Sequence, residues 1–211
     1  MEMRLTRLPS SEGGPSCLVS EFSLVCTSLS VAMVFWRDAG SCCCNWDASG
    51  DSSRSQTFAD DLGKRFPEDT AVRFSYLPVL HALLALKSGE PAKAIELLQI
   101  AAPYEFGSPP SAFGPFGALY PIYVRGEAYL AANQGAEAAA EFQKILDHRG
   151  IVISDPIGAL ARWRLGKAFV MLGETAKARD AYKDFLTLWK DADPDIPILK
   201  QAKAEYAGLH Q

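Results

Sequence analysis

One phrase occurs three times along the chain and decides the fold: LKSGEPAKAIELLQI at 86–100, ANQGAEAAAEFQKIL at 132–146 and LGETAKARDAYKDFL at 172–186. Each copy contains a Gly, one to three polar or Pro residues, a central Ala and a bulky residue four positions after it. The central residues are Ala94, Ala138 and Ala178, which are 44 and 40 positions apart. A phrase that recurs at this period predicts a protein built from stacked repeats.

A fainter copy lies at 48–62, ASGDSSRSQTFADDL, with Ser55 in the position of the Ala, 39 residues before Ala94. Ala- and Leu-rich stretches flank each Gly, so each unit is expected to be a hairpin of two helices. Gly ends the first helix because it adopts the left-handed conformation without strain. The first helices are predicted at 71–87, 117–132 and 156–172, and the second helices at 91–101, 136–147 and 175–189.

The pattern also predicts how the two helices of a hairpin pack. The central Ala allows a close approach, and the bulky residue one turn later (Leu98, Phe142 or Tyr182) fills the gap beside it. Gly126 and Gly166 are expected to allow the same close contact within the first helices. A Gly in mid-helix costs about 1 kcal/mol relative to Ala, so packing is its expected reason.

Composition excludes several functional classes. With 211 residues and 48% apolar content the chain can bury one sizeable core. The net charge is −4 and acidic and basic residues are interleaved, so there is no electrostatic footprint for nucleic acid. The chain likewise has no basic amphipathic face for a membrane surface.

Residues 1–48 differ from the rest of the chain. All five cysteines (Cys17, Cys26, Cys42, Cys43 and Cys44) lie here, an odd number that does not indicate a disulfide framework. There is no CxxC pair, so we expect no metal site and a reducing, cytoplasmic compartment. The uncharged stretch 22–36 is short for a membrane span, which needs about 20 residues. Its apolar spacing predicts a helix over 18–36; a signal or anchor, or poor order, remains the alternative.

The repeats resemble the tetratricopeptide repeat family over residues 50–190. The last unit carries the clearest match: Leu165, Gly166, Phe169, Ala178, Tyr182 and Phe185. Arg125 departs from the family's usual Leu, and His81-Ala82 stands in place of Leu-Gly. The resemblance implies an all-α, right-handed superhelix of antiparallel helical hairpins over 49–211, comprising three full hairpins and a half repeat. A final capping helix is expected after Asp195, which would cap it.

A narrower resemblance covers KRFPEDT (64–70), KILDHRGIV (144–152) and DFLTLWKDADPDIPILKQAKAEYA (184–207). These stretches are similar to the C-terminal repeat arrays of some bacterial serine/threonine protein kinases. The resemblance implies a docking or sensory module, and the chain has no glycine-rich phosphate loop, HRD or DFG motif of a kinase core.

The resemblance also implies a site, because the first helices of such arrays line a concave groove that binds peptides. The matching inward positions are Tyr76, Val79, Leu83, Tyr120, Tyr123, Glu127, Trp163 and Lys167, with Leu160 beside them. A groove that is aromatic and has few charges favours an apolar or aromatic-anchored partner, with no cofactor. Tyr123 and Trp163 are expected to form one aromatic platform. The alternative is that these side chains pack within the protein.

An enzyme is the alternative function. Gly50-Asp51-Ser52 resembles the nucleophile block of GDS-type serine hydrolases, with His148 or His210 as candidate base. The late Asp-x-x-His pair of those enzymes is missing, and a capping role at the start of a helix explains Ser52 more simply. A non-enzymatic scaffold that binds other proteins is therefore the predicted function.

Overall fold

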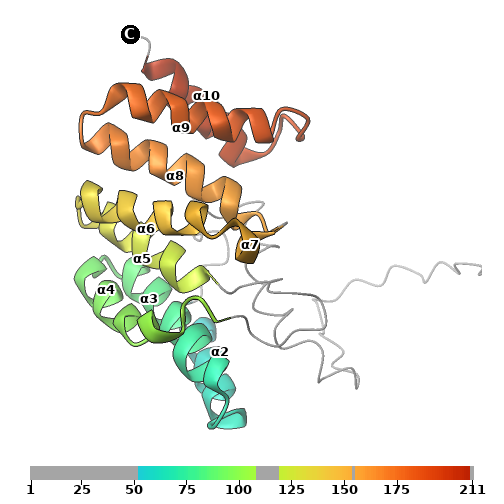
Figure 1. The fold of residues 1–211 in the computed structure, drawn as a ribbon. Coiled ribbons are helices and arrows are strands. Elements are labelled where there is room, and N and C mark those ends of the chain that lie inside the picture. Colours follow the sequence, from blue (N-terminus) through green and yellow to red (C-terminus); the bar gives the residue numbers. More distant parts are fainter. Residues whose placement is uncertain (1–51, 108–118, 154, 210–211) are drawn as a thin grey trace, which may run out of the picture.

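The computed structural model describes residues 52–107, 119–153 and 155–209, and within these ranges the regular structure is entirely helical. Figure 1 shows the helices stacked in chain order from α2 to α10. The principal helices are α2 (Ser52–Arg65), α3 (Leu77–Lys87), α4 (Pro91–Gln99), α5 (Tyr120–Ala131), α6 (Gly135–Asp147), α8 (Ile157–Met171), α9 (Thr175–Leu188) and α10 (Pro197–Gly208). Shorter elements are the π-helical turn η2 (Val72–Tyr76), the 3-10 turn η3 (Ala102–Tyr104) and α7 (Arg149–Val152). The predicted all-α fold of stacked helical hairpins is confirmed for the described residues.

The three hairpins α3–α4, α5–α6 and α8–α9 turn in the same way. The amide three residues past the last residue of each first helix donates to a carbonyl oxygen near the end of that helix: Glu90 to Ala85 (2.9 Å), Gln134 to Tyr129 (2.8 Å) and Glu174 to Phe169 (2.9 Å). This is the hydrogen-bond pattern of a Schellman motif, which requires one residue in the left-handed region.

That left-handed residue corrects one prediction. Gly89 and Gly173 have φ of 74°, as expected, but in the middle hairpin the position is held by Asn133 with φ of 58°. Gly135 is instead the first residue of α6. Asn tolerates this conformation better than other residues with a side chain, because its short polar group bonds locally.

The close packing predicted within each hairpin is confirmed. Ala94, Ala138 and Ala178 are fully buried. A Cβ atom added to Gly126 would lie 2.7 Å from the ring of Phe142, and one added to Gly166 would lie 2.9 Å from the ring of Tyr182. Both glycines are therefore needed for the helices to approach this closely.

The N-terminal end has a small core of its own. Ala59 and Leu62 of α2 pack with Val72 and Leu80, with Phe66, Tyr76 and Leu77 around them. The helix predicted at 18–36 and the rest of 1–48 lie outside the described residues, and the predicted boundary at 48–49 stays a prediction.

Helix α10 covers the last hairpin with Ile198, Leu199 and Ala202, all buried. The predicted cap at Asp195 is wrong. Ile196 precedes the helix without a side-chain cap, and the Asp195 carboxylate accepts a 2.8 Å hydrogen bond from Lys200 Nζ. This ion pair lowers the pKa of Asp195.

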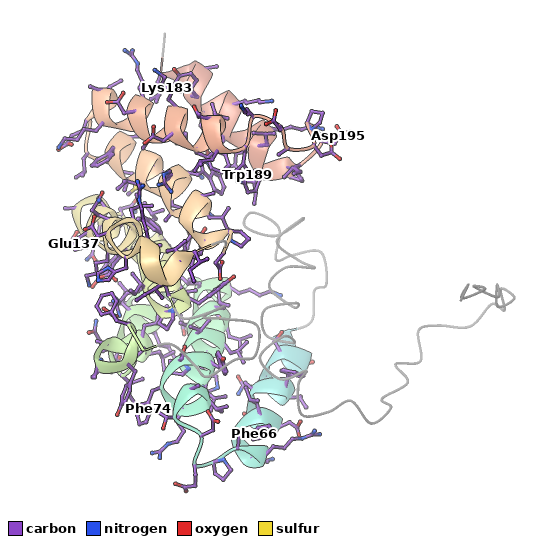
Figure 2. All side chains as sticks on the ribbon, turned by 45° about the vertical axis from the view of Figure 1, so that its right-hand side comes forward. Phe66, Phe74, Glu137, Lys183, Trp189 and Asp195 are labelled. Carbon is purple, nitrogen blue, oxygen red and sulfur yellow. The ribbon has the colours of Figure 1, made fainter. Side chains whose placement is uncertain are left out.

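Polar side chains on the second helices of the hairpins extend into solvent. Figure 2 shows Glu137 on α6 and Lys183 on α9 pointing away from the helices, where both are exposed. None of the helices in the described ranges is both long and apolar enough to cross a membrane.

Candidate functional site

A cavity of about 530 Å³ opens between α5, α8 and α10, on the side formed by the first helices of the hairpins. Its walls are Glu127, Leu130 and Ala131 of α5, Arg164, Lys167, Val170 and Met171 of α8, Tyr182 of α9, and Glu205 and Leu209 of α10. We call it the inner groove. Its volume lies in the range of ordinary ligand sites, about 300–1,000 Å³.

Charged side chains line part of the inner groove, and the first pair joins α5 to α8. Arg164 Nε lies 2.6 Å from Glu127 Oε1, with Arg164 buried. Burial raises the pKa of Glu127, while the charges of Arg164 and Lys167 and a hydrogen bond from Tyr123 oppose that shift. This carboxylate is therefore held by groups of the protein itself.

The second group of contacts meets at Glu205 of α10. Lys167 Nζ lies 3.0 Å from Glu205 Oε1. The indole Nε1 of Trp163 and the hydroxyl of Tyr182 donate to Glu205 Oε2, at 2.8 and 3.1 Å. Burial raises the pKa of Tyr182, and the negative charge of Glu205 raises it further. One carboxylate thus ties α10 to both α8 and α9.

The two cations also lie close to the Trp163 ring. Arg164 Cζ is 4.1 Å and Lys167 Nζ is 5.0 Å from the ring centroid, which is within the range of cation–π attraction. These contacts fix both cations above the buried indole.

The outer edge of the inner groove is apolar. Val170 is 45% exposed and Met171 is 41% exposed, beside the half-buried Leu130 and Leu209. The charged groups of the groove are paired with one another, so an incoming apolar group would not have to separate them. Exposed apolar side chains at the edge of a cavity are typical of binding sites.

Three predicted groove residues lie in the core, which corrects the prediction at these positions. Trp163 is fully buried, and Val79 and Tyr123 are 2% and 3% exposed. The predicted aromatic platform is absent at the surface of the described chain. Tyr123 instead packs edge-on against Phe142, and Trp163 lies against Phe185. The reason is that α10 and its Glu205 cover Trp163.

The other predicted residues divide into two groups. Glu127 and Lys167 line the inner groove. Tyr76, Leu83 and Tyr120 are half-buried against the two hydrophobic cores, as is expected of first-helix residues that pack against neighbouring helices; Leu160 is buried.

Sequence reasoning missed Val170, Met171, Glu205 and Leu209 as groove residues. Val170 and Met171 fall at the end of a first helix, one turn beyond the inward positions that were counted. A count of i+3 and i+4 from Lys167 would have found them.

The residues considered for hydrolysis are placed differently. Ser52 is the first residue of α2. His148 follows α6, with Nδ1 2.7 Å from the Lys144 carbonyl oxygen and its ring stacked on Phe106 at 4.2 Å. Gly50, Asp51 and His210 lie outside the described residues.

The fold defines a helical-repeat protein built from stacked hairpins, with the inner groove on the side of the first helices. A model of the tetratricopeptide repeat family matches residues 123–195, which run from α5 to the loop before α10. This match supports the tetratricopeptide repeat family, whose members generally mediate protein–protein interaction. No curated protein and no solved structure matches the chain.

Proposed function

We propose that this chain is a non-enzymatic scaffold that binds an apolar segment of a partner protein in the inner groove. The supporting observation is the exposed pair Val170 and Met171 in a groove whose ion pairs are already matched within the protein. The partner segment gains free energy mainly by burying apolar surface, at roughly 25 cal/mol per Å².

The paired charges would give the groove its selectivity. A partner with a charged group at the groove floor would have to compete with Glu127–Arg164 or Lys167–Glu205, which are already in contact. Breaking such a pair leaves an uncompensated charge and costs several kcal/mol when buried. An apolar segment meets no such cost, so we expect it to be preferred.

The resemblance to kinase-associated arrays adds a narrower proposal. The partner would belong to a signalling system, and the chain would act there as a docking or sensory module in the cytoplasm. The resemblance of 64–70, 144–152 and 184–207 supports this, and the partner's identity would test it.

The test compares partner capture by the full-length chain and by single variants. Met171→Asp places a charge at the groove's apolar edge and is expected to abolish capture of the partner from a lysate of the source organism. Leu188→Asp is the matched control, because Leu188 is 57% exposed on α9 and does not line the groove. If both variants capture the same proteins as the wild type, the inner groove is not the binding site.

A further inference from the structure

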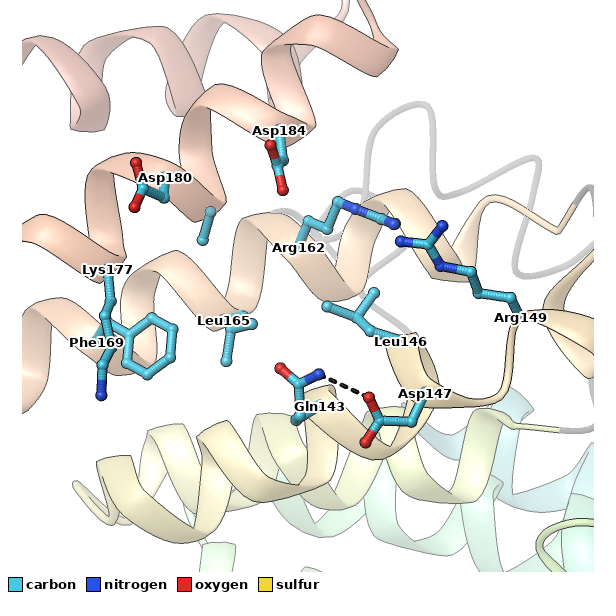
Figure 3. Close-up of a pocket in the computed structure, with 11 residues that line it drawn as sticks. Gln143, Leu146, Asp147, Arg149, Arg162, Leu165, Phe169, Lys177, Asp180 and Asp184 are labelled. Carbon is cyan, nitrogen blue, oxygen red and sulfur yellow. Dashed lines mark hydrogen bonds between the residues drawn. The ribbon is translucent and has the colours of Figure 1, made fainter.

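A second cavity, of about 470 Å³, lies on the other side of α8, between α6 and α9 (Figure 3). We call it the outer cavity. Leu165 and Phe169 of α8 line it, whereas Lys167 and Met171 of the same helix line the inner groove. Successive residues of a helix turn by about 100°, so these two pairs fall on different faces of α8.

Two arginines meet at one end of the outer cavity. Figure 3 shows Arg162 of α8 and Arg149 of α7 extending toward one another. In the part of the chain that the structure describes, neither guanidinium lies within ion-pair distance of a carboxylate. Arg162 Nη1 donates a 2.8 Å bond to the Gly158 carbonyl, which leaves most of its five N–H donors unused.

The two guanidinium groups repel one another, and this repulsion affects the pKa of Arg162. Burial lowers the pKa of Arg162, the charge of Arg149 lowers it further, and Asp184 opposes both effects. Two neighbouring positive charges without an anion between them cost free energy, which a bound anion would recover.

We propose that Arg149 and Arg162 bind a phosphate monoester, held between their two guanidinium groups. Two planar forks supply paired N–H donors and two positive charges, which match the oxygens and the charge of a phosphate dianion. A carboxylate needs only one such fork. The site lies apart from the inner groove and does not depend on the function proposed for that groove.

The rest of the outer cavity restricts the ligand. Of its apolar side chains, Leu146 lies nearest the arginine pair, Leu165 lies farther along the cavity, and Phe169 lies at the opposite end. The organic part of a phosphate monoester would lie along Leu146 and Leu165. Asp147, Asp180 and Asp184 line the same cavity and would repel an extended polyanion. A single phosphate on an apolar or aromatic group, such as a phosphorylated side chain, therefore fits better than nucleic acid.

The test is calorimetric titration of the full-length protein with phenyl phosphate and with inorganic phosphate, at pH 7.5 and constant ionic strength. We expect phenyl phosphate to bind at least several-fold more tightly, because its ring contacts the apolar side chains. Arg149→Gln and Arg162→Gln should each weaken binding at least tenfold. Binding should also weaken below about pH 6, where the phosphate loses its second charge.

Lys177→Gln is the matched control, because Lys177 lines the same cavity but is paired with Glu174 at 2.6 Å. This variant should bind phenyl phosphate as the wild type does. Arg149 is exposed, so its variant should fold normally, and thermal melting checks Arg162→Gln.

Each other outcome has a fixed meaning. The proposal would be overturned if phenyl phosphate did not bind the wild type, or if both arginine variants bound it as tightly as the wild type does. A loss of affinity in Lys177→Gln as large as that in the arginine variants would also overturn it. Equal affinity for the two probes would support the oxyanion site but assign it to free phosphate.

Discussion

Arg125 Nη2 lies 2.7 Å from Glu105 Oε2, and this buried contact joins α5 to the segment that follows η3. Arg125 also contacts Glu141 of α6, with Nε at 3.0 Å and Nη2 at 2.5 Å from Oε2. Lys144 Nζ lies 2.8 Å from Glu141 Oε1, so two cations and two carboxylates form a neutral cluster. Arg125 stands where the family usually has Leu. Its contact with Glu105 holds the segment after η3, which is not part of the repeat pattern.

Replacing Arg125 with Leu should destabilise the protein, although Leu matches the family pattern. Glu105 and Glu141 would remain buried without their main partner, and breaking a buried ion pair in this way costs about 3–5 kcal/mol. Urea unfolding measures the loss. The triple variant Arg125→Leu, Glu105→Gln, Glu141→Gln removes the charges together and should recover part of it. No recovery would show that packing, and not unpaired charge, carries the effect.

Gly126→Ala and Gly166→Ala should each lower the free energy of unfolding by about 1–3 kcal/mol, which is the usual cost of forcing extra atoms into a packed core. The added methyl group would meet the ring of Phe142 or of Tyr182. Gly150→Ala is the control, since a Cβ there meets no atom within 4 Å. Equal melting temperatures for all three variants would contradict the packing role.

Asn133 should tolerate Gly but not a β-branched residue. At φ of 58° a side chain strains the backbone, at a cost of roughly 1–2 kcal/mol for an ordinary L-residue. Asn133→Val is therefore expected to lower the melting temperature by several degrees, and Asn133→Gly to leave it unchanged or raise it. A Val variant as stable as the wild type would mean that the turn can adopt another conformation.

Stability should fall at alkaline pH partly because of Tyr182. The pKa of Tyr182 is raised in the folded state. The stability that Tyr182 contributes is therefore fully present below the pKa of about 10 that it has in the unfolded state, and it is lost as the pH rises above that value. Tyr182→Phe should be less stable at pH 8 by about 1 kcal/mol, for the lost hydrogen bond to Glu205. The gap to the wild type should narrow above pH 10. A constant gap between pH 8 and 11 would argue against this linkage.

Trp163→Ala should unfold more readily by about 3–5 kcal/mol, as is usual for a fully buried Trp. Trp163→Phe keeps an aromatic ring but loses the indole N–H that donates to Glu205, and it should lower the free energy of unfolding by less than Trp163→Ala does. Melting curves of both variants distinguish packing from hydrogen bonding. A Trp163→Ala protein of wild-type stability would contradict the core position of Trp163 and would favour a surface contact role.

The repeat unit could be predicted because its determinants are local. The central Ala and the small residue in the middle of each first helix are required for steric reasons that recur along the chain, so Gly126 and Gly166 were found from spacing alone. The turn residue was assigned correctly at Gly89 and Gly173. Asn133 was missed because the turn was assigned to the nearby Gly135. Asn133 nevertheless lies five residues before Ala138, as Gly89 lies five residues before Ala94.

The candidate site could be predicted only in part, because it depends on contacts between distant segments. Glu127 and Lys167 were found by their position on first helices. The burial of Trp163 depends on Glu205, 42 residues later, and no local pattern reports where α10 lies. The partnership of Arg125 with Glu105 likewise depends on the path of a non-repeating loop.

Helix α8 forms a wall of both cavities, with Arg164 and Lys167 on one face and Arg162 and Leu165 on the other. The two sites therefore share one rigid body of 15 residues. Should a ligand in either cavity shift this helix, thermodynamic reciprocity requires the two affinities to change by the same factor. Partner affinity measured with and without phenyl phosphate would then give the coupling free energy directly. Binding of the partner would in that case depend on the phosphate ligand, and binding of the phosphate ligand on the partner.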